Sequence, residues 1–239
     1  MVVGIQSVRL AAARHSTVAY KGAMALSGLI MVLYLLAHMY GNLKVFSGKA
    51  AFDGYAEHLR ELGEPILPHA AALWIIRVVL LASVLVHFYA ALVLWRRARR
   101  ASDRGGGSRY QSTKNRLGVQ RTYASFTMRW GGLLVGLFIV YHLLHLTADY
   151  IAPGGASDSP YERMVNGFQI WWVVLSYTLP LLALGFHLRH GIWSACATLG
   201  ANTSVARRRH LNQVAIVLAV LITVGFLIPP YAILFGWVG

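Results

Sequence analysis

The chain has 239 residues, of which 57% are hydrophobic and only 13% are charged. A soluble domain usually has about a quarter charged residues, so this composition excludes a water-soluble globular protein. The net charge of +14 would by itself suggest a nucleic-acid partner. The basic residues are confined to short segments between long apolar runs, however, and this pattern indicates a polytopic membrane protein, in contact with membrane lipid and without nucleic acid.

Five segments are long and apolar enough to cross a bilayer as helices, which takes about 20 residues each. In chain order they are expected at 22–43, 70–95, 127–151, 168–197 and 211–237. The fifth segment contains Pro229-Pro230, which is expected to end that helix early. Because the sequence has neither an internal repeat nor a second domain, residues 1–239 are predicted to form one all-α bundle of five transmembrane helices.

The charges in the connections predict how the bundle is oriented. The segment from Arg96 to Arg129, which includes the predicted basic loop 96–126, has ten Lys or Arg residues and one acidic residue. Residues 42–69 have three basic and four acidic residues, and residues 149–167 have one basic and three acidic residues. The positive-inside rule therefore puts the N-terminus and the basic loop in the cytoplasm and the C-terminus outside. The expected location is the inner (plasma) membrane.

Histidines are the main ionisable residues within the predicted spans, and each such residue is a candidate functional group because burying it is costly. With a rise of about 1.5 Å per residue, the directions of the helices give the depth of each histidine. His38 of the first helix and His142 of the third lie toward the outer surface. His87 of the second and His187 of the fourth lie toward the inner surface. The histidines thus form an outer pair and an inner pair, each joining two helices.

Two imidazoles that face each other across a helical bundle are what bis-histidine ligation of a haem iron requires. Neutral imidazole is a good iron ligand and has no charge to desolvate when it is buried. Glycines near the ligands would let a flat macrocycle approach the backbone. The two propionates of a haem would also need cations, and the candidates are Lys21, Arg77, Arg129 and Arg189.

Other interpretations of these residues stay open. A single histidine in a membrane helix is more often a hydrogen-bonded packing residue than a ligand, and histidine chains also occur in proton-conducting transporters. Arg77 is also explained by snorkelling to the outer interface. His145 and His190 each lie three residues beyond a proposed ligand and leave the choice of ligand open.

Several segments resemble one known family. The stretch KGAMALSGLIMVLYLLAHMYGNLKVFSG at 21–48 resembles the first helix of the cytochrome b membrane anchor of succinate dehydrogenase and fumarate reductase, most clearly in HMYGNL. MRWGGLLVGLFIVYH at 128–142 resembles the third-helix pattern, in which an arginine precedes the ligand histidine by thirteen positions. FHLRHGIWS at 186–194 resembles the fourth-helix pattern, and LVHFYAALVLW at 85–95 fits the second more loosely. The resemblance covers all five helices.

The resemblance implies the single-polypeptide type of anchor, with five helices and two haem b groups. It implies His38 and His142 as ligands of the outer haem and His87 and His187 as ligands of the inner haem, in agreement with the depths above. It further implies a flavoprotein subunit and an iron–sulfur subunit on the cytoplasmic face, and menaquinone as the electron acceptor. A quinone-site acid is expected in the first outer loop, where the candidates are Glu57, Glu61 and Glu64.

The expected function is therefore electron transfer from succinate oxidation to quinone, by an anchor subunit that performs no succinate chemistry itself. The basic loop is expected to form much of the platform for the iron–sulfur subunit. The acids of the first outer loop are explained equally well by surface ion pairs with Lys44, Lys49 and Arg60. One alternative function is a di-haem cytochrome b anchor of a hydrogenase or formate dehydrogenase. Another is a haem-free, proton-coupled transporter with a histidine relay.

Overall fold

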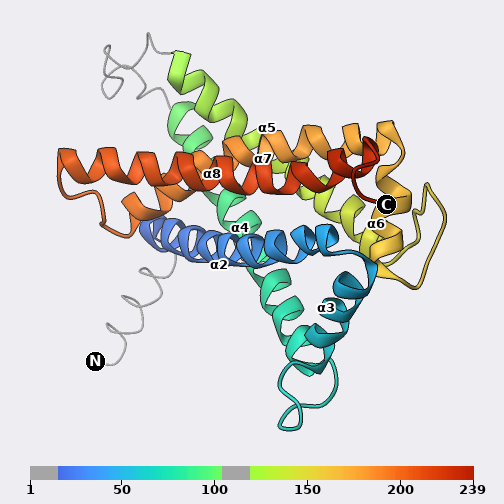
Figure 1. Ribbon diagram of the computed structural model, residues 1–239. Helices are drawn as coiled ribbons and strands as arrows, with labels where there is room; N and C mark the ends of the chain where they lie inside the picture. Colours follow the sequence, from blue (N-terminus) through green and yellow to red (C-terminus); the bar gives the residue numbers. More distant parts are fainter. Residues whose placement is uncertain (1–15, 104–118) are drawn as a thin grey trace.

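The computed structural model describes residues 16–103 and 119–239, and within these residues the fold is helical without any strand (Figure 1). Residues 104–118 of the predicted basic loop lie outside the described residues. Among the described residues, five helices are long and apolar enough to cross a membrane, so the predicted all-α bundle of five spans is confirmed. They are α2 (Thr17–Leu43), α4 (Ala71–Asp103), α5 (Val119–His142), α7 (Trp171–Thr198) and α8 (Val205–Leu234).

The spanning helices differ from the predicted segments mainly at their ends. α2 and α8 each begin five or six residues before the predicted start, because Ser16 and Ser204 cap them. The Ser16 hydroxyl accepts a hydrogen bond from the Ala19 N–H at 3.0 Å, and the Ser204 hydroxyl accepts one from the Arg207 N–H at 3.2 Å. Such caps satisfy backbone donors that the first turn leaves free. They therefore extend helices beyond the apolar run that hydropathy detects.

Pro229 and Pro230 were expected to end α8, but the helix passes through both and continues to Leu234. Proline's fixed φ fits a helix, and transmembrane helices tolerate the lost hydrogen bonds where neighbouring helices support them. Pro229 is among the fully buried side chains, so this part of α8 is held between its neighbours. α7 likewise passes through Pro180 without a break.

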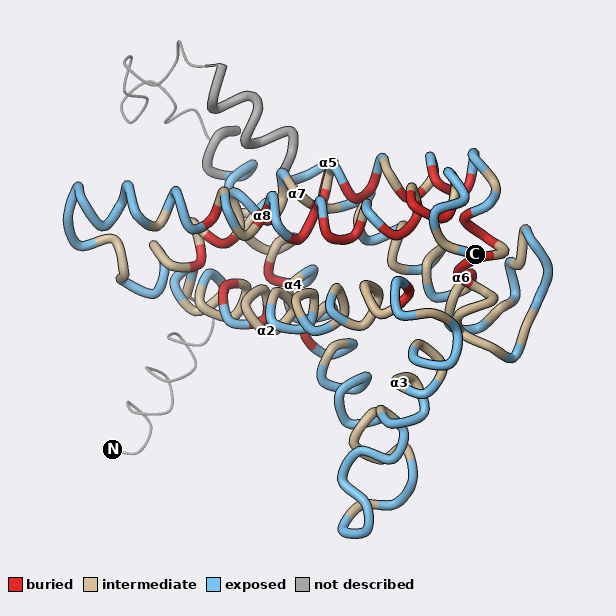
Figure 2. Tube along the Cα trace, in the orientation of Figure 1, coloured by how far each residue is buried: buried red, intermediate tan, exposed pale blue. Residues whose placement is uncertain are grey.

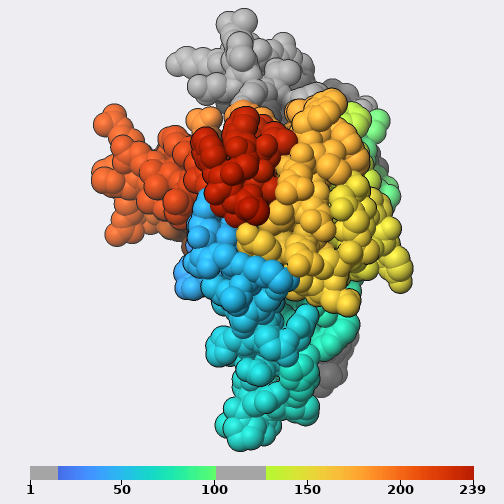
Figure 3. Space-filling view, turned by 45° about the vertical axis from the view of Figure 1, so that its right-hand side comes forward, coloured from blue at the N-terminus to red at the C-terminus, as the bar shows by residue number. Residues whose placement is uncertain are grey.

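The connections on the predicted outer side contain short helices that hydropathy does not detect. The first has η1 (Lys44–Ser47) and α3 (Lys49–Glu61), and the second has η3 (Leu143–Thr147) and α6 (Pro160–Phe168). The predicted third span therefore consists of two parts. Its α-helix ends at His142, and the π-helical turn η3 follows directly. α3 and the start of α4 project from the rest of the bundle (Figures 1 and 3).

The bundle is built from two helix pairs and a fifth helix. α2 packs along α4, and α5 packs along α7. The two pairs meet where α2 packs along α7, and α8 packs along α7 while also touching α2. Within the described residues, no extended contact joins α2 to α5 or α4 to α7. Most buried residues lie on α7 and α8, as Figure 2 shows, and the apolar core includes Val173, Leu181, Ile222 and Phe226. α7 and α8 are therefore the central helices on which the pairs assemble.

Gly185 allows α7 and α8 to approach closely. An ideal Cβ at this position would lie only 2.5 Å from the Thr223 hydroxyl oxygen of α8. That hydroxyl is itself held, because it donates a hydrogen bond of 2.7 Å to the Ala219 carbonyl. Small residues at helix interfaces are a main source of packing energy in membranes. The close contact therefore depends on glycine at position 185.

A polar cluster on the predicted outer side joins α3 to α6. The Asp53 carboxylate accepts hydrogen bonds from the Ser159 hydroxyl at 2.6 Å and from the Tyr161 N–H at 3.0 Å, at the start of α6. Lys49 lies 3.2 Å from Asp53 and 2.9 Å from Glu162. Burial alone would raise the pKa of Asp53, but these hydrogen bonds and the Lys49 charge outweigh it and hold the pKa below its ordinary 3.8.

Gly185→Ala should destabilise the bundle by about 1–3 kcal/mol, because the added methyl group overpacks the α7–α8 contact. Gly191→Ala is the matched control on the same helix, since nothing lies within 4 Å of its ideal Cβ. Thermal unfolding of the purified protein in detergent measures both variants. Equal unfolding temperatures for the two variants would contradict the assignment of Gly185 as a packing residue.

Asp53→Ala should cost about 1–3 kcal/mol of stability near neutral pH, because it removes hydrogen bonds to a charged group. A carboxylate with a lowered folded-state pKa stabilises the fold above its unfolded pKa and loses that effect as the pH falls through the folded pKa. The stability difference between wild type and variant should therefore shrink below about pH 4. Unfolding temperatures over a pH series test this, with the exposed Asp158→Ala as control. A difference that does not change with pH would refute it.

Candidate functional site

The outer candidate histidines face each other across the bundle. His38 comes from α2 and His142 from the last residue of α5, and their ring centroids lie 5.7 Å apart at an interplanar angle of 79°. Three further aromatic rings lie beside the pair. Tyr34 stacks on His38 at 5.2 Å, Phe226 of α8 lies 5.6 Å from it, and Phe138 lies 5.8 Å from His142.

The inner candidate histidines form a second pair with similar geometry. His87 of α4 and His187 of α7 have ring centroids 6.1 Å apart and an interplanar angle of 57°. Each pair thus joins two helices that lack extended contacts with each other in the described part of the chain. The structure brings together the same two pairs that the depth count predicts, one at each level.

Both centroid separations leave the room that one metal ion needs between the rings. Metal–imidazole bonds are about 2 Å long, and each ring centroid lies about 1 Å beyond its ligating nitrogen. Two imidazoles on opposite sides of one iron therefore have centroids about 6 Å apart, which matches 5.7 and 6.1 Å. The spacing of the rings fits bis-histidine ligation of one iron at each level.

The two levels are well separated along the helices. Ser27 of α2 contacts His87 and lies eleven residues before His38, a rise of about 16 Å. On α5, Gly132 contacts His187 and lies ten residues before His142, a rise of about 15 Å. Two independent helices therefore give the same vertical distance between the levels.

Each inner histidine ring lies on a glycine of the neighbouring helix. An ideal Cβ at Gly28 would be 3.4 Å from Cε1 of His87, and one at Gly132 would be 3.4 Å from Cε1 of His187. The two glycines belong to α2 and α5, the helices that pack along the ligand-bearing α4 and α7. Because Gly28 and Gly132 have no side chain, they leave the space that the rings of His87 and His187 occupy.

Hydrogen bonds orient one ring of each pair. His87 Nδ1 lies 3.1 Å from the Met24 carbonyl, to which its N–H donates. His142 Nδ1 lies 3.4 Å from the Tyr177 hydroxyl. A proton held on Nδ1 leaves Nε2 free as a ligand nitrogen. His187 Nδ1 is buried and has no hydrogen-bond partner among the described residues, so a hydrogen-bonded packing role does not explain this histidine.

The two histidines that left the choice of ligand open occupy different environments. His145 is only 2% exposed, and its Nδ1 lies 2.8 Å from the Tyr177 hydroxyl. His190 is partly exposed and lies beside Trp193, with ring centroids 6.5 Å apart. Neither ring faces a histidine of another helix in the described contacts. The structure therefore pairs His142 and His187, and not their neighbours, across the bundle.

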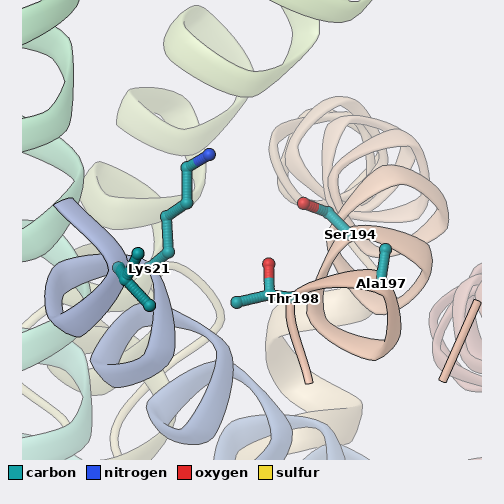
Figure 4. Close-up of a pocket in the computed structure, with 5 residues that line it drawn as sticks. Lys21, Ser194, Ala197 and Thr198 are labelled. Carbon is teal, nitrogen blue, oxygen red and sulfur yellow. The ribbon is translucent and has the colours of Figure 1, made fainter. Parts of the chain in front are cut away.

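The candidate cations are at the two ends of the spans. Lys21 lines an open cleft of about 380 Å³ between α2 and α7, with the Ser194 and Thr198 hydroxyls on its other side (Figure 4). Arg77 is exposed, and its guanidinium lies 4.8 Å from the centroid of the Trp74 ring. Arg129 and Arg189 are also exposed side chains.

The candidate quinone-site acids lie on α3 and the segment after it, where all three are exposed. Glu57 forms an ion pair with Arg60 at 2.5 Å, and Glu64 lies 3.1 Å from His69. Lys49 does not pair with these acids but with Asp53 and Glu162. Surface ion pairing thus accounts for Glu57 and Glu64, with partners that the sequence predicts only in part.

Sequence reasoning missed the groups that orient the rings. Tyr177 lies ten residues before His187 on α7, about 15 Å nearer the outer side, which is the level of His38 and His142. The same depth count that located the histidines would have located this tyrosine. No sequence signal identifies the Met24 carbonyl, because every residue has one.

Comparisons with known proteins identify the family. No curated protein and no solved structure matches the chain. The family model of the succinate dehydrogenase/fumarate reductase transmembrane subunit matches residues 108–227, just over half of the chain. The match contains His142 and His187, whereas the helices that carry His38 and His87 precede it. The chain belongs to the family of succinate dehydrogenase/fumarate reductase transmembrane subunits.

Proposed function

We propose that this chain is the haem b membrane anchor of a succinate dehydrogenase in the inner (plasma) membrane, acting as a succinate:menaquinone oxidoreductase subunit with two haems. The observation that carries the proposal is the pair of facing imidazoles at each of two depths, with ring centroids 5.7 and 6.1 Å apart. Family membership supports the coarser part, a membrane subunit of such an enzyme complex.

Each helix of the two pairs would contribute one iron ligand. His38 and His142 would hold the outer haem, and His87 and His187 the inner haem. Bound haem b supplies one-electron carriers between an iron–sulfur subunit and quinone. The chain's own groups orient the ligands: the Met24 carbonyl holds the His87 ring through Nδ1, and the glycines at 28 and 132 keep the ring positions open.

Propionate charges would be met by cations at the ends of the helices. Lys21, with the Ser194 and Thr198 hydroxyls, is the best placed for the inner level because it lies six residues, about 9 Å, beyond the Ser27 level. Arg77 lies ten residues outward of His87 and is the candidate at the outer level. Arg129 and Arg189 are the remaining candidates, toward the predicted cytoplasmic side.

The partners follow from the proposed role. A flavoprotein subunit and an iron–sulfur subunit would dock on the cytoplasmic face, where the end of α4 presents Arg96, Arg97, Arg99 and Arg100. Menaquinone would be reduced near the outer level, with protons relayed by a carboxylate of the first outer loop. The candidates are Glu57, Glu61 and Glu64, of which only Glu61 has no ion pair among the described residues.

Two other functions compete with this one. An anchor of a hydrogenase or formate dehydrogenase would also bind two haems, but family membership favours the succinate dehydrogenase complex. A haem-free proton-coupled transporter would use the same histidines as a relay. A reduced-minus-oxidised visible spectrum of the purified protein decides between a haem-binding anchor and the transporter, because a b-type α-band supports the anchor and a colourless protein contradicts it.

Ligand substitutions should affect the two levels separately. His38→Ala or His142→Ala should remove the outer haem and leave the inner one, whereas His87→Ala or His187→Ala should do the reverse, because each iron loses one of its two axial ligands. The content of each haem measures the result. His145→Ala and His190→Ala are the matched controls, and loss of the outer haem in His145→Ala but not in His142→Ala would refute the assignment.

The glycine beside His187 should tolerate only small side chains. Gly132→Ala places its Cβ at ordinary contact distance from the ring, so it should retain the inner haem. Gly132→Val adds two further atoms against the ring and should reduce inner haem content. Gly136→Val, on the same helix with nothing within 4 Å of its ideal Cβ, is the control. Equal inner haem content in the two valine variants would contradict this reading of the site.

A further inference from the structure

A tyrosine hydroxyl lies between two histidines of the outer level. The Tyr177 hydroxyl of α7 is 3.4 Å from Nδ1 of His142 and 2.8 Å from Nδ1 of His145. Tyr177 is only 4% exposed and His145 only 2%. Both side chains are therefore buried, and a polar atom of theirs without a hydrogen-bond partner would cost stability.

A hydroxyl has one proton, which constrains how it can serve two imidazole nitrogens. If His142 binds iron through Nε2, its Nδ1 carries a proton and must donate it. Tyr177 then accepts from His142 through its oxygen and donates its own proton to Nδ1 of His145. The reverse order would place the His142 proton on Nε2 and remove that nitrogen as a ligand.

The surroundings fix the position of Tyr177. Its ring packs perpendicular to those of Phe138 and Phe168, with centroids 5.0 and 4.8 Å away. His145 is held in turn on Gly167 of α6, where an ideal Cβ would lie 2.5 Å from its Nε2. The π-helical turn η3 begins directly after His142 and contains His145. Such turns are frequent at functional sites.

We propose that Tyr177 is a positioning residue that holds His142 in its Nδ1–H form, with His145 as the anchor of the Tyr177 hydroxyl. The inference rests on the proposed function, because it gives a role to a ligand of the outer haem. An acceptor on Nδ1–H increases the electron donation of a metal-bound imidazole. The Tyr177 hydroxyl thereby favours the ferric state of the outer haem and lowers its reduction potential.

Tyr177→Phe tests this, because it removes the hydroxyl and keeps the packed ring. In the purified complex, redox titration should show a more positive midpoint potential for the outer haem and no change for the inner one. The low-spin ferric EPR signal of the outer haem should also shift, since the His142 ring is freed to rotate. His145→Leu should shift the outer potential in the same direction by less.

Tyr141→Phe is the matched control, since Tyr141 precedes His142 but its hydroxyl lies 3.4 Å from that of Ser176. It should leave both potentials and the EPR spectrum unchanged. An outer haem with wild-type potential and EPR signal in Tyr177→Phe overturns the inference. A wild-type protein without b-type haem would overturn the proposed function itself, so the two failures are distinguishable. The inner haem, present in the same sample, reports that the variant is folded.

Discussion

A polar ring in hydrocarbon must find a partner at its own depth, and this constraint organises the bundle. Because the rise of a helix is fixed, two imidazoles on different helices can meet only if their positions along the chain match. The positions match in this way twice, for His38 with His142 and for His87 with His187. α2 then lies opposite α5 and α4 opposite α7, separated by ring pairs and without extended backbone contact among the described residues. The ring pairs thus bridge the two junctions at which the helices do not pack directly, whereas α2 and α7 pack along each other.

A bundle opened in this way needs its packing energy from other contacts. α8, which has no histidine within its apolar part, supplies them by packing along α7 and against α2. Glycines permit this approach, since a Cβ at Gly185 would meet Thr223, and one at Gly225 would overlap the Met39 side chain. α7 is therefore shared, with one face on α8 and His187 directed toward α4. The burial of α7 and α8 and the exposure of α4 follow from this division (Figure 2).

Much of this arrangement was predictable from the sequence, because it depends on periodicity and depth. The five spans and the two facing pairs of histidines required only apolar length, chain direction and rise per residue. The ends of α2 and α8 were missed because serine caps extend helices past the apolar run. α6 and the π-helical turn were missed because each depends on tertiary contacts, such as the Asp53 carboxylate at the start of α6. The partners of the imidazole nitrogens are a backbone carbonyl and a tyrosine hydroxyl, which have no pattern of their own.

The two levels differ in how their rings are held, and the difference has a physical consequence. His87 is bonded to the Met24 carbonyl, which no side-chain substitution removes. His142 is bonded to a side chain, Tyr177, whose hydroxyl is anchored by His145. His145 rests on Gly167 of α6, and Asp53 holds the start of that helix against α3. A continuous series of contacts thus runs from the polar cluster at the outer surface to the outer histidine pair.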